Sequence, residues 1–168
     1  MDKLYIPGDL VMTNGAPLGT EQDVVYRVTS SDPSKTLKLG DGTVMKGVVR
    51  LENLEGVEFG DKGYLFGDCC AWVKDIVPIP ITPEILEKNG WVKEVMSRGV
   101  KNRHWVYTKP DIEEYGYFPI YIEKGIGDEF DVYPFTDNNV CTQIAYIKYV
   151  HELQHLLFGL GINHEMEV

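Results

Sequence analysis

The chain has 168 residues but few cysteines and no long apolar run. Its three cysteines, Cys69, Cys70 and Cys141, form an odd set without C-x-x-C spacing, which predicts reduced thiols in a cytosolic compartment. No stretch of about 18 uninterrupted apolar residues occurs, and the first residues show no basic segment followed by an apolar one. We therefore expect a cytoplasmic protein that neither crosses a membrane nor carries an export signal.

Basic side chains are also scarce. The chain has 16 Lys and Arg against 26 Asp and Glu, for a formal net charge of −10. This balance argues against non-specific nucleic-acid binding, because such binding depends on neutralising phosphates with Lys and Arg. Residues 93–109 are the exception, with five basic side chains and one acidic, whereas residues 110–168 hold two basic and eleven acidic ones. One short basic segment therefore lies on an acidic protein.

The first half of the chain has the pattern of a small β-barrel. Apolar residues make up 43% of the chain, which is enough for a core. Residues 9–13 and 24–30 are β-branched runs, and Asp41-Gly42 stands between two alternating runs, as in a two-residue hairpin. A second hairpin is expected at Gly67-Asp68. Five or so short strands predict an SH3-like barrel over residues 1–77.

Residues 78–168 predict an α+β domain. Thr82 is suited to cap a short helix with Pro83 at its first position, and Asn89-Gly90 should end it. Aromatic-rich extended runs follow at residues 104–110, 115–125, 129–135 and 138–147. In the second run, alternation predicts that residues 118, 120 and 122 face one side of the sheet and residues 117, 119 and 121 the other. Three or four antiparallel strands should therefore precede a C-terminal helix.

The C-terminal helix is amphipathic. At 100° per residue, its apolar positions form one stripe that should pack, while His151 and His155 lie on nearly the opposite side. The stripe consists of Val150, Leu153, Leu157 and Leu160.

Residues 151–155 read His-Glu-x-x-His, the helix pattern of zinc peptidases. In that interpretation His151 and His155 bind Zn²⁺ and Glu152 is the general base. The further histidine of one such class is absent, because position 161 is glycine, so His164 is the remaining local candidate for a third ligand. The simpler interpretation, which we favour, is a docked helix whose solvated face carries these residues without a metal.

Two stretches, "DIVPIPITPEILEKNGW" at residues 75–91 and "AYIKYVHELQHLLFGLGINHEMEV" at residues 145–168, resemble a family of small uncharacterised proteins from phages, prophages and mobile elements of gut bacteria. The resemblance covers about half of the chain. In that family the positions matching Glu152 and His155 are often Gln and Asn. The resemblance therefore implies a non-catalytic protein, and it brings no activity with it.

The basic segment is a candidate ligand site. Arg98, Lys101, Arg103, His104 and Trp105 combine guanidinium groups with an aromatic face, as nucleotide sites do. A solvated hairpin tip is the interpretation we favour. The barrel could instead offer a peptide groove lined by aromatic side chains, although most of these are expected in the core. They are Tyr5, Tyr26, Tyr64 and Trp72.

From the sequence we expect a phage or mobile-element accessory protein that binds a protein partner, has no cofactor and is not an enzyme. Two alternatives stay open. One is a zinc-dependent hydrolase using residues 151–155. The other is a nucleotide-binding anti-defence protein using residues 93–109.

Overall fold

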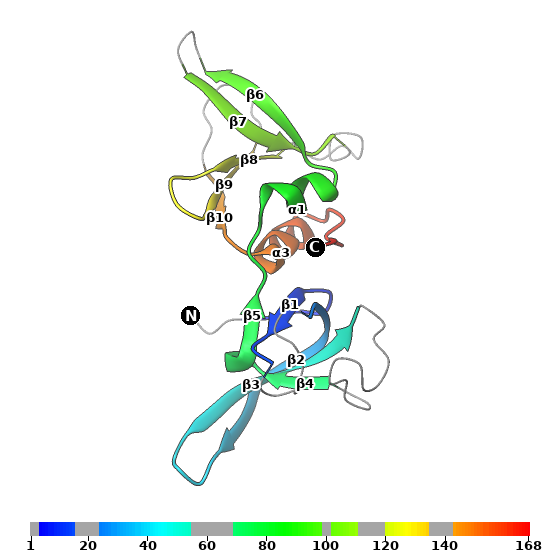
Figure 1. Cartoon of the computed structure of the whole chain (residues 1–168), viewed down its shortest axis with the longest axis vertical. Helices are drawn as coiled ribbons and strands as arrows, with labels where there is room; N and C mark the ends of the chain where they lie inside the picture. Colours follow the sequence, from blue (N-terminus) through cyan, green and yellow to red (C-terminus); the bar gives the residue numbers. More distant parts are fainter. Residues whose placement is uncertain (1–3, 16–23, 55–68, 99–101, 111–119, 135–142) are drawn as a thin grey trace. The chain divides into compact units, whose positions relative to one another are not determined.

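A computed structural model describes residues 4–15, 24–54, 69–98, 102–110, 120–134 and 143–168. The chain forms two compact units, Met1–Ile79 and Pro80–Val168, here named the N-unit and the C-unit. The division expected from the sequence lay after residue 77. Among the described residues each unit contains a five-stranded antiparallel sheet and helices are few, so the chain is mostly β, which is compatible with the expected α+β class (Figure 1). In the part of the chain that is described, no helix has the length and apolar content to cross a membrane.

The N-unit sheet has the strand order β4-β3-β2-β1-β5. Among the described residues no pairing joins the edge strands β4 and β5, so the sheet is open there and the expected barrel closure is not established. The elements are β1 (Leu10–Thr13), β2 (Tyr26–Lys38), β3 (Val44–Asn53), β4 (Cys69–Trp72), the 3-10 turn η1 (Val73–Asp75) and β5 (Ile76–Pro78).

A single apolar cluster forms the N-unit core. Tyr5 and Tyr26, considered above for a groove, are buried in it, and Trp72 is half-buried. Tyr64 and the expected turn at Gly67-Asp68 lie outside the described residues. The other members of the cluster are Val11, Val24, Val28, Val49, Leu51, Ala71 and Ile76.

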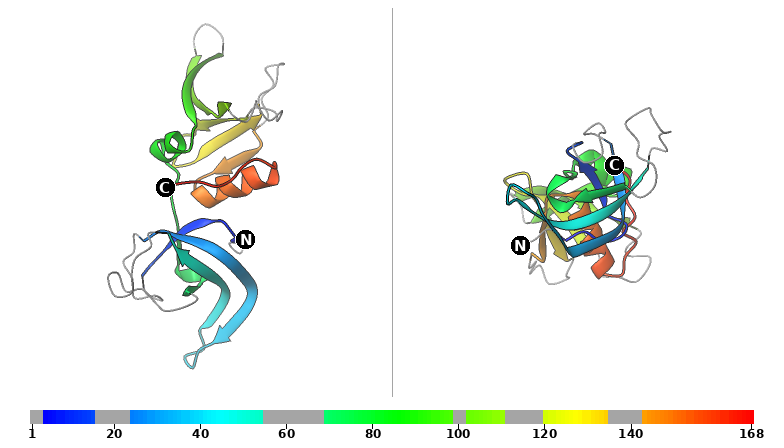
Figure 2. Two further views of the ribbon diagram at one scale, coloured as in Figure 1. Left: turned by 90° about the vertical axis from the view of Figure 1, so that its right-hand side faces the viewer. Right: turned by 90° about the horizontal axis from the view of Figure 1, so that it is seen from below.

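Strands β2 and β3 continue beyond their neighbours as a two-stranded arm, residues 32–47 (Figure 2). The expected two-residue turn is wrong: the last strand pair is Lys38 with Val44, and the loop between them is closed by the Leu39 N–H, which donates to the Thr43 carbonyl at 2.8 Å. Gly42 does adopt the positive φ, +89°, that the Asp-Gly pair predicted. Strand β2 is longer than the run expected at residues 24–30 because it pairs with β3 as far as Lys38. The local sequence pattern gives no information about that pairing.

The base of the arm is packed against η1 at Gly47. Its φ is +73°, and a Cβ added there would lie 2.8 Å from the Val73 Cγ2. Only glycine satisfies both the backbone angle and this close approach.

The C-unit sheet has the strand order β10-β9-β8-β7-β6, all antiparallel. Its strands are β6 (Val92–Arg98), β7 (Asn102–Thr108), β8 (Ile120–Lys124), β9 (Phe130–Pro134) and β10 (Ala145–Ile147). The alternating faces expected for the second aromatic run agree with the continuous pairing of β8 with β9, and Ile120, Tyr121 and Ile122 are all buried. The strand is central in the sheet and is covered on both faces, so its burial does not alternate.

Helix α1 (Pro83–Lys88) begins and ends as its residues predict. The Thr82 Oγ1 accepts from the Ile85 N–H at 3.3 Å, Asn89 is the C-cap, and Gly90 has a φ of +82°. These signals are local, so the sequence alone was sufficient to place this helix.

Helix α3 (Val150–Gly159) buries three residues of the expected stripe, Val150, Leu153 and Leu157. Two expectations about its faces are wrong. His151 is buried although it was placed on the solvated side, and Leu160 at the C-cap is 39% exposed.

After α3 the chain returns toward α1. The side-chain amide of Asn89 donates to the Glu167 carbonyl at 2.7 Å, and its Oδ1 accepts from the Glu167 N–H at 2.8 Å. Ile162 and Met166 are buried along the way. The Lys88 ammonium also donates to the Val168 carbonyl at 2.9 Å, and the Gln154 amide donates to the His164 carbonyl at 3.3 Å, so packing and several hydrogen bonds hold the C-terminal tail.

Candidate ligand pocket beside helix α3

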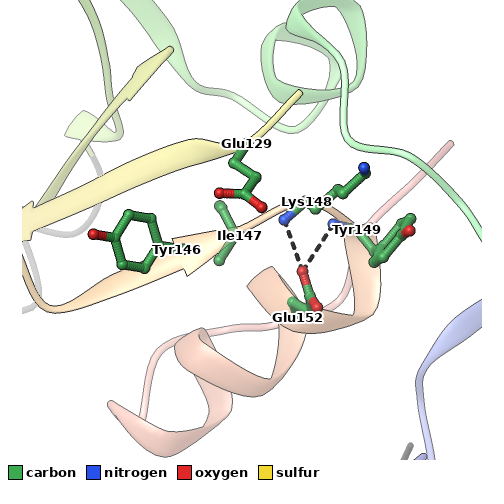
Figure 3. Close-up of a pocket in the computed structure, with 6 residues that line it drawn as sticks. All are labelled: Glu129, Tyr146, Ile147, Lys148, Tyr149 and Glu152. Atoms are coloured by element: carbon green, nitrogen blue, oxygen red, sulfur yellow. Dashed lines mark hydrogen bonds between the residues drawn. The ribbon is translucent and has the colours of Figure 1, made fainter. Parts of the chain in front are cut away.

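A cavity of about 320 Å³ lies in the C-unit, where β9 and β10 meet the start of α3 (Figure 3). Figure 3 shows the two tyrosine rings on opposite sides of it, with one glutamate above and one below. The six lining residues, here named the α3 pocket, are Glu129, Tyr146, Ile147, Lys148, Tyr149 and Glu152.

The short strand β10 positions the pocket. Ile147 is buried and pairs with Phe130 of β9, so its neighbour Tyr146 points the other way and is 66% exposed. The segment that follows is fixed by the Lys148 carbonyl, which accepts from the Ile81 N–H at 2.9 Å. The backbone of residues 147–148, which forms one wall of the pocket, is therefore held by its pairing with β9 and by the hydrogen bond from Ile81.

Glu152 caps the helix from inside the pocket. One of its carboxylate oxygens accepts from the Lys148 N–H at 2.7 Å and from the Tyr149 N–H at 3.0 Å. It lies at the third helical position, where a carboxylate satisfies backbone donors and faces the positive end of the helix dipole. Glu152 therefore has a structural role, and one oxygen of its carboxylate is occupied by two backbone donors.

Glu129 is the second carboxylate of the pocket. It lies immediately before β9 and is exposed, and among the described residues no side chain or backbone donor pairs with its carboxylate. In Figure 3 its carboxylate is directed into the space beside Ile147. It is thus the acceptor that a bound cation would meet.

Lys148 stands at the rim. Its ammonium lies 3.7 Å from the Asp128 carboxylate and 5.9 Å from the centre of the Tyr149 ring. Figure 3 shows this side chain directed away from the Glu129 carboxylate. The pocket's own lysine is therefore held at its edge, and it demonstrates that the Tyr149 face accommodates an ammonium group.

The arrangement favours a cationic ligand. Two carboxylates attract positive charge, and the exposed Tyr146 ring offers a negative face to a cation and an apolar surface to a methylene chain. Lysine and arginine side chains combine these properties. An anion would meet two carboxylates, and the backbone N–H groups at the start of α3 that could bind it are already occupied by Glu152.

Of the His-Glu-x-x-His pattern, Glu152 lines the pocket, whereas His151 and His155 do not. The rings of His151 and His155 are 5.7 Å apart, edge to face, and the His151 ring stacks on Tyr149 at 5.8 Å. His151 is only 7% exposed because it packs between these two rings.

His164 does not complete a ligand set in the part of the chain that the structure describes. Its ring lies 5.1 Å from the centre of the Phe158 ring, and no group of three His, Cys, Asp or Glu residues capable of holding a metal ion occurs there. The structure thus leaves His151 and His155 as a pair.

Cys70 is an exposed free cysteine on the N-unit edge strand β4.

The basic segment forms the hairpin of β6 and β7 at the opposite sheet edge from β10. Lys101 lies outside the described residues, and Arg98, Arg103 and His104 are placed only as backbone, in the register of Ser97 with Arg103.

Trp105 is 59% exposed, and the Lys93 ammonium lies 5.0 Å from its ring centre. Tyr107 is buried, and burial raises its pKa, as do the nearby carboxylates of Glu87 and Glu84 on α1. Lys109 donates to the Asn89 carbonyl at 2.9 Å. The described side chains of the segment are therefore engaged within the C-unit.

Sequence reasoning missed Glu129, Tyr146 and Lys148 as site residues. Each stands in a different local context and carries no motif, and the strands β9 and β10 bring them together. The acidic balance of residues 110–168 was the one available signal, because it indicated that cations are favoured in this part of the chain. We find no match of the chain to protein-family models, to curated proteins or to solved structures.

Proposed function

We propose that this chain is a non-catalytic binding protein whose α3 pocket receives a lysine or arginine side chain of a protein partner. One observation carries the proposal: the exposed Glu129 carboxylate has no pairing group among the described residues and stands in a cavity between two tyrosines. An incoming ammonium or guanidinium group can form a charge-assisted hydrogen bond with this exposed carboxylate.

The dimensions fit one long side chain. A cavity of about 320 Å³ is at the lower end of the range for small-ligand pockets, about 300–1,000 Å³. A lysine stem can lie along the exposed Tyr146 ring while its ammonium reaches Glu129. The exposed Tyr146 and the neighbouring Ile144, 46% exposed, then contact the residues on either side of the lysine. Aromatic residues of this kind dominate binding energy at protein interfaces.

The zinc alternative is not part of this proposal. It needs Glu152 as a base, and the Glu152 carboxylate is held by two backbone N–H groups. The side chains of the nucleotide alternative lie outside the described part of the chain except for that of Trp105, so this alternative stays a prediction.

The N-unit is proposed to be an SH3-like domain. Two features support this: the strand order β4-β3-β2-β1-β5, and a 3-10 turn between the two edge strands. A phage or mobile-element origin and a cytoplasmic location remain proposals that rest on the sequence. Neither is needed for the binding chemistry of the C-unit.

The test is an NMR titration with capped tripeptides. Gly-Lys-Gly and Gly-Arg-Gly are the probes, and Gly-norleucine-Gly has the same apolar stem without charge. Saturable shifts at the amides of residues 146–149 and 152, with the charged probes only, are expected. Glu129→Gln should abolish them, and Glu94→Gln, on exposed β6, should not. An equal response to norleucine, or shifts elsewhere, would overturn the proposal.

A further inference from the structure

Strand β6 is an edge of the C-unit sheet. Among the described residues it pairs with β7 alone, through seven consecutive antiparallel pairs from Val92 with Thr108 to Arg98 with Asn102. The other edge strands are shorter: β5 and β10 have three residues each and β4 has four. In an antiparallel strand every second residue directs its N–H and C=O away from the paired neighbour. The outer side of β6 therefore offers backbone donors and acceptors to a further strand.

Strand β6 has few of the features that protect an edge from such an addition. Natural sheets interrupt long edges with bulges or prolines, but the pairing of β6 with β7 has no register shift and β6 contains no proline. Residues 92–95 are all exposed, Val92 and Val95 at 45% each. The lysine between these valines is a charged edge residue. It repels strands of its own sign and attracts strands of the opposite sign.

The register gathers a cationic and apolar surface on one face of this edge. Val95 lies opposite Trp105, and Lys93 shares their face because alternate residues of a strand point the same way. The Trp105 ring is 59% exposed, and the Lys93 ammonium lies 5.0 Å from its centre. An aromatic ring attracts an ammonium group without cancelling its charge. The acidic residue of the strand, Glu94, lies opposite Val106 and belongs to the other face.

The charge of the β6–β7 hairpin selects an acidic partner. Residues 92–108 contain four basic side chains and one acidic, for a net charge of +3, on a chain whose net charge is −10. The basic ones are Lys93, Arg98, Lys101 and Arg103. Helix α1, before the hairpin, carries Glu84, Glu87 and Lys88, which add −1 and leave the region positive. An acidic segment is therefore attracted to this edge although the chain as a whole repels it.

We infer that β6 is a second binding surface of the C-unit, onto which an extended acidic segment of a partner protein adds as a sixth strand. Backbone hydrogen bonds to β6 hold the segment, and its side chains alternate between the two faces of the sheet. On one face a carboxylate meets Lys93 and an apolar side chain contacts Val95 and Trp105. This surface is separate from the α3 pocket, because β6 and β10 are opposite edges of the sheet. A nucleic-acid strand would share the negative charge but has no peptide backbone to continue the ladder.

An NMR titration of the full chain, labelled with nitrogen-15, tests this inference. The probe is the acetylated and amidated peptide Glu-Val-Glu-Val-Glu. One control has Lys in place of Glu, and the other is the probe with every backbone nitrogen methylated, which keeps its charges but removes its N–H groups. Saturable shifts at residues 92–98 are expected with the probe and should weaken as salt is added. Each control should bind at least about tenfold more weakly.

Hydrogen exchange distinguishes strand addition from charge attraction alone. At saturation with the probe, alternate amides of β6 should exchange with solvent at least about tenfold more slowly, because carbonyls of the added strand accept from them. Lys93→Glu should weaken probe binding at least about tenfold, whereas Lys38→Glu, exposed in the N-unit, should not. A dispersed spectrum first confirms that each variant is folded.

Four results would overturn the inference. They are absence of binding by the probe, equal binding by either control peptide, an unchanged exchange pattern in β6, and binding of hexathymidylate as tight as that of the probe. Broadening of the β6 signals in the free chain that disappears on dilution would identify a second copy of this chain as the occupant, and would overturn it too. Glu129→Gln should bind the probe normally, so this result is independent of the proposed function of the α3 pocket.

Discussion

Replacing Glu152 separates a capping role from a catalytic one. In Glu152→Ala, the N–H groups of Lys148 and Tyr149 lose their acceptor at 2.7 and 3.0 Å. Loss of a cap costs about 0.5–2 kcal/mol, and loss of a negative charge at a helix N-terminus about 0.3–1 kcal/mol. We therefore expect the C-unit to lose about 1–3 kcal/mol of unfolding free energy. Glu152→Gln keeps an acceptor and should lose only the charge contribution.

Equilibrium urea unfolding is the assay for Glu152. Fluorescence of Trp91, which is buried in the C-unit, reports on the relevant transition. Glu165→Ala, on the exposed tail, is the matched control and should stay within about 0.5 kcal/mol of the wild type. A catalytic carboxylate is usually neutral or costly for stability. An unchanged or more stable Glu152→Ala protein would therefore refute the capping argument, and the interpretation of Glu152 as a general base would again be open.

Three further predictions follow from local geometry. Asn89→Ala removes two hydrogen bonds to Glu167 of the tail and should cost about 1–3 kcal/mol, measured by the same unfolding assay; an unchanged value would show that these two hydrogen bonds do not stabilise the C-unit. Gly47→Ala should destabilise the N-unit by about 2–4 kcal/mol for two reasons: an alanine is strained at this positive φ, and its Cβ would lie 2.8 Å from the Val73 side chain. An unfolding free energy equal to that of the wild type would contradict this. Hydrogen bonds from its own backbone N–H and from Thr82 lower the Glu84 pKa below 4.5, so its contribution to α1 is present above that pH and is lost as pH falls through the folded pKa. An NMR titration of the Glu84 carboxyl that gave an ordinary value would show that these hydrogen bonds do not form in solution.

The parts of the fold that the sequence predicted correctly carry local signals. Thr82, Pro83 and the Asn89-Gly90 pair each act within one turn of helix α1, so no tertiary information was required. Most strand positions in both sheets were likewise visible as β-branched or aromatic runs.

The incorrect parts depend on long-range pairing. The arm exceeds the predicted strand because β3 continues the ladder through the irregular stretch of β2 that contains Pro33. His151 is buried because Tyr149 and His155 enclose it, which a helical wheel cannot predict.

The capping role of Glu152 was hidden for a different reason. The residue at the helix N-cap is Tyr149, whereas the recognisable sequence pattern begins with Ser or Thr. The glutamate was therefore assigned to the zinc motif, and its backbone partners became evident only once the path of residues 148–149 was known.

The most direct test of the cation pocket is the ratio of dissociation constants for Gly-norleucine-Gly and Gly-Lys-Gly, measured on the wild type and on Glu129→Gln. A charge-assisted hydrogen bond contributes about 1.5–3 kcal/mol, so the wild type should prefer lysine by about tenfold or more. The variant should bind both probes equally. Equal binding by the wild type, or a lysine preference that survives in Glu129→Gln, would contradict the proposal that this pocket recognises a cationic side chain.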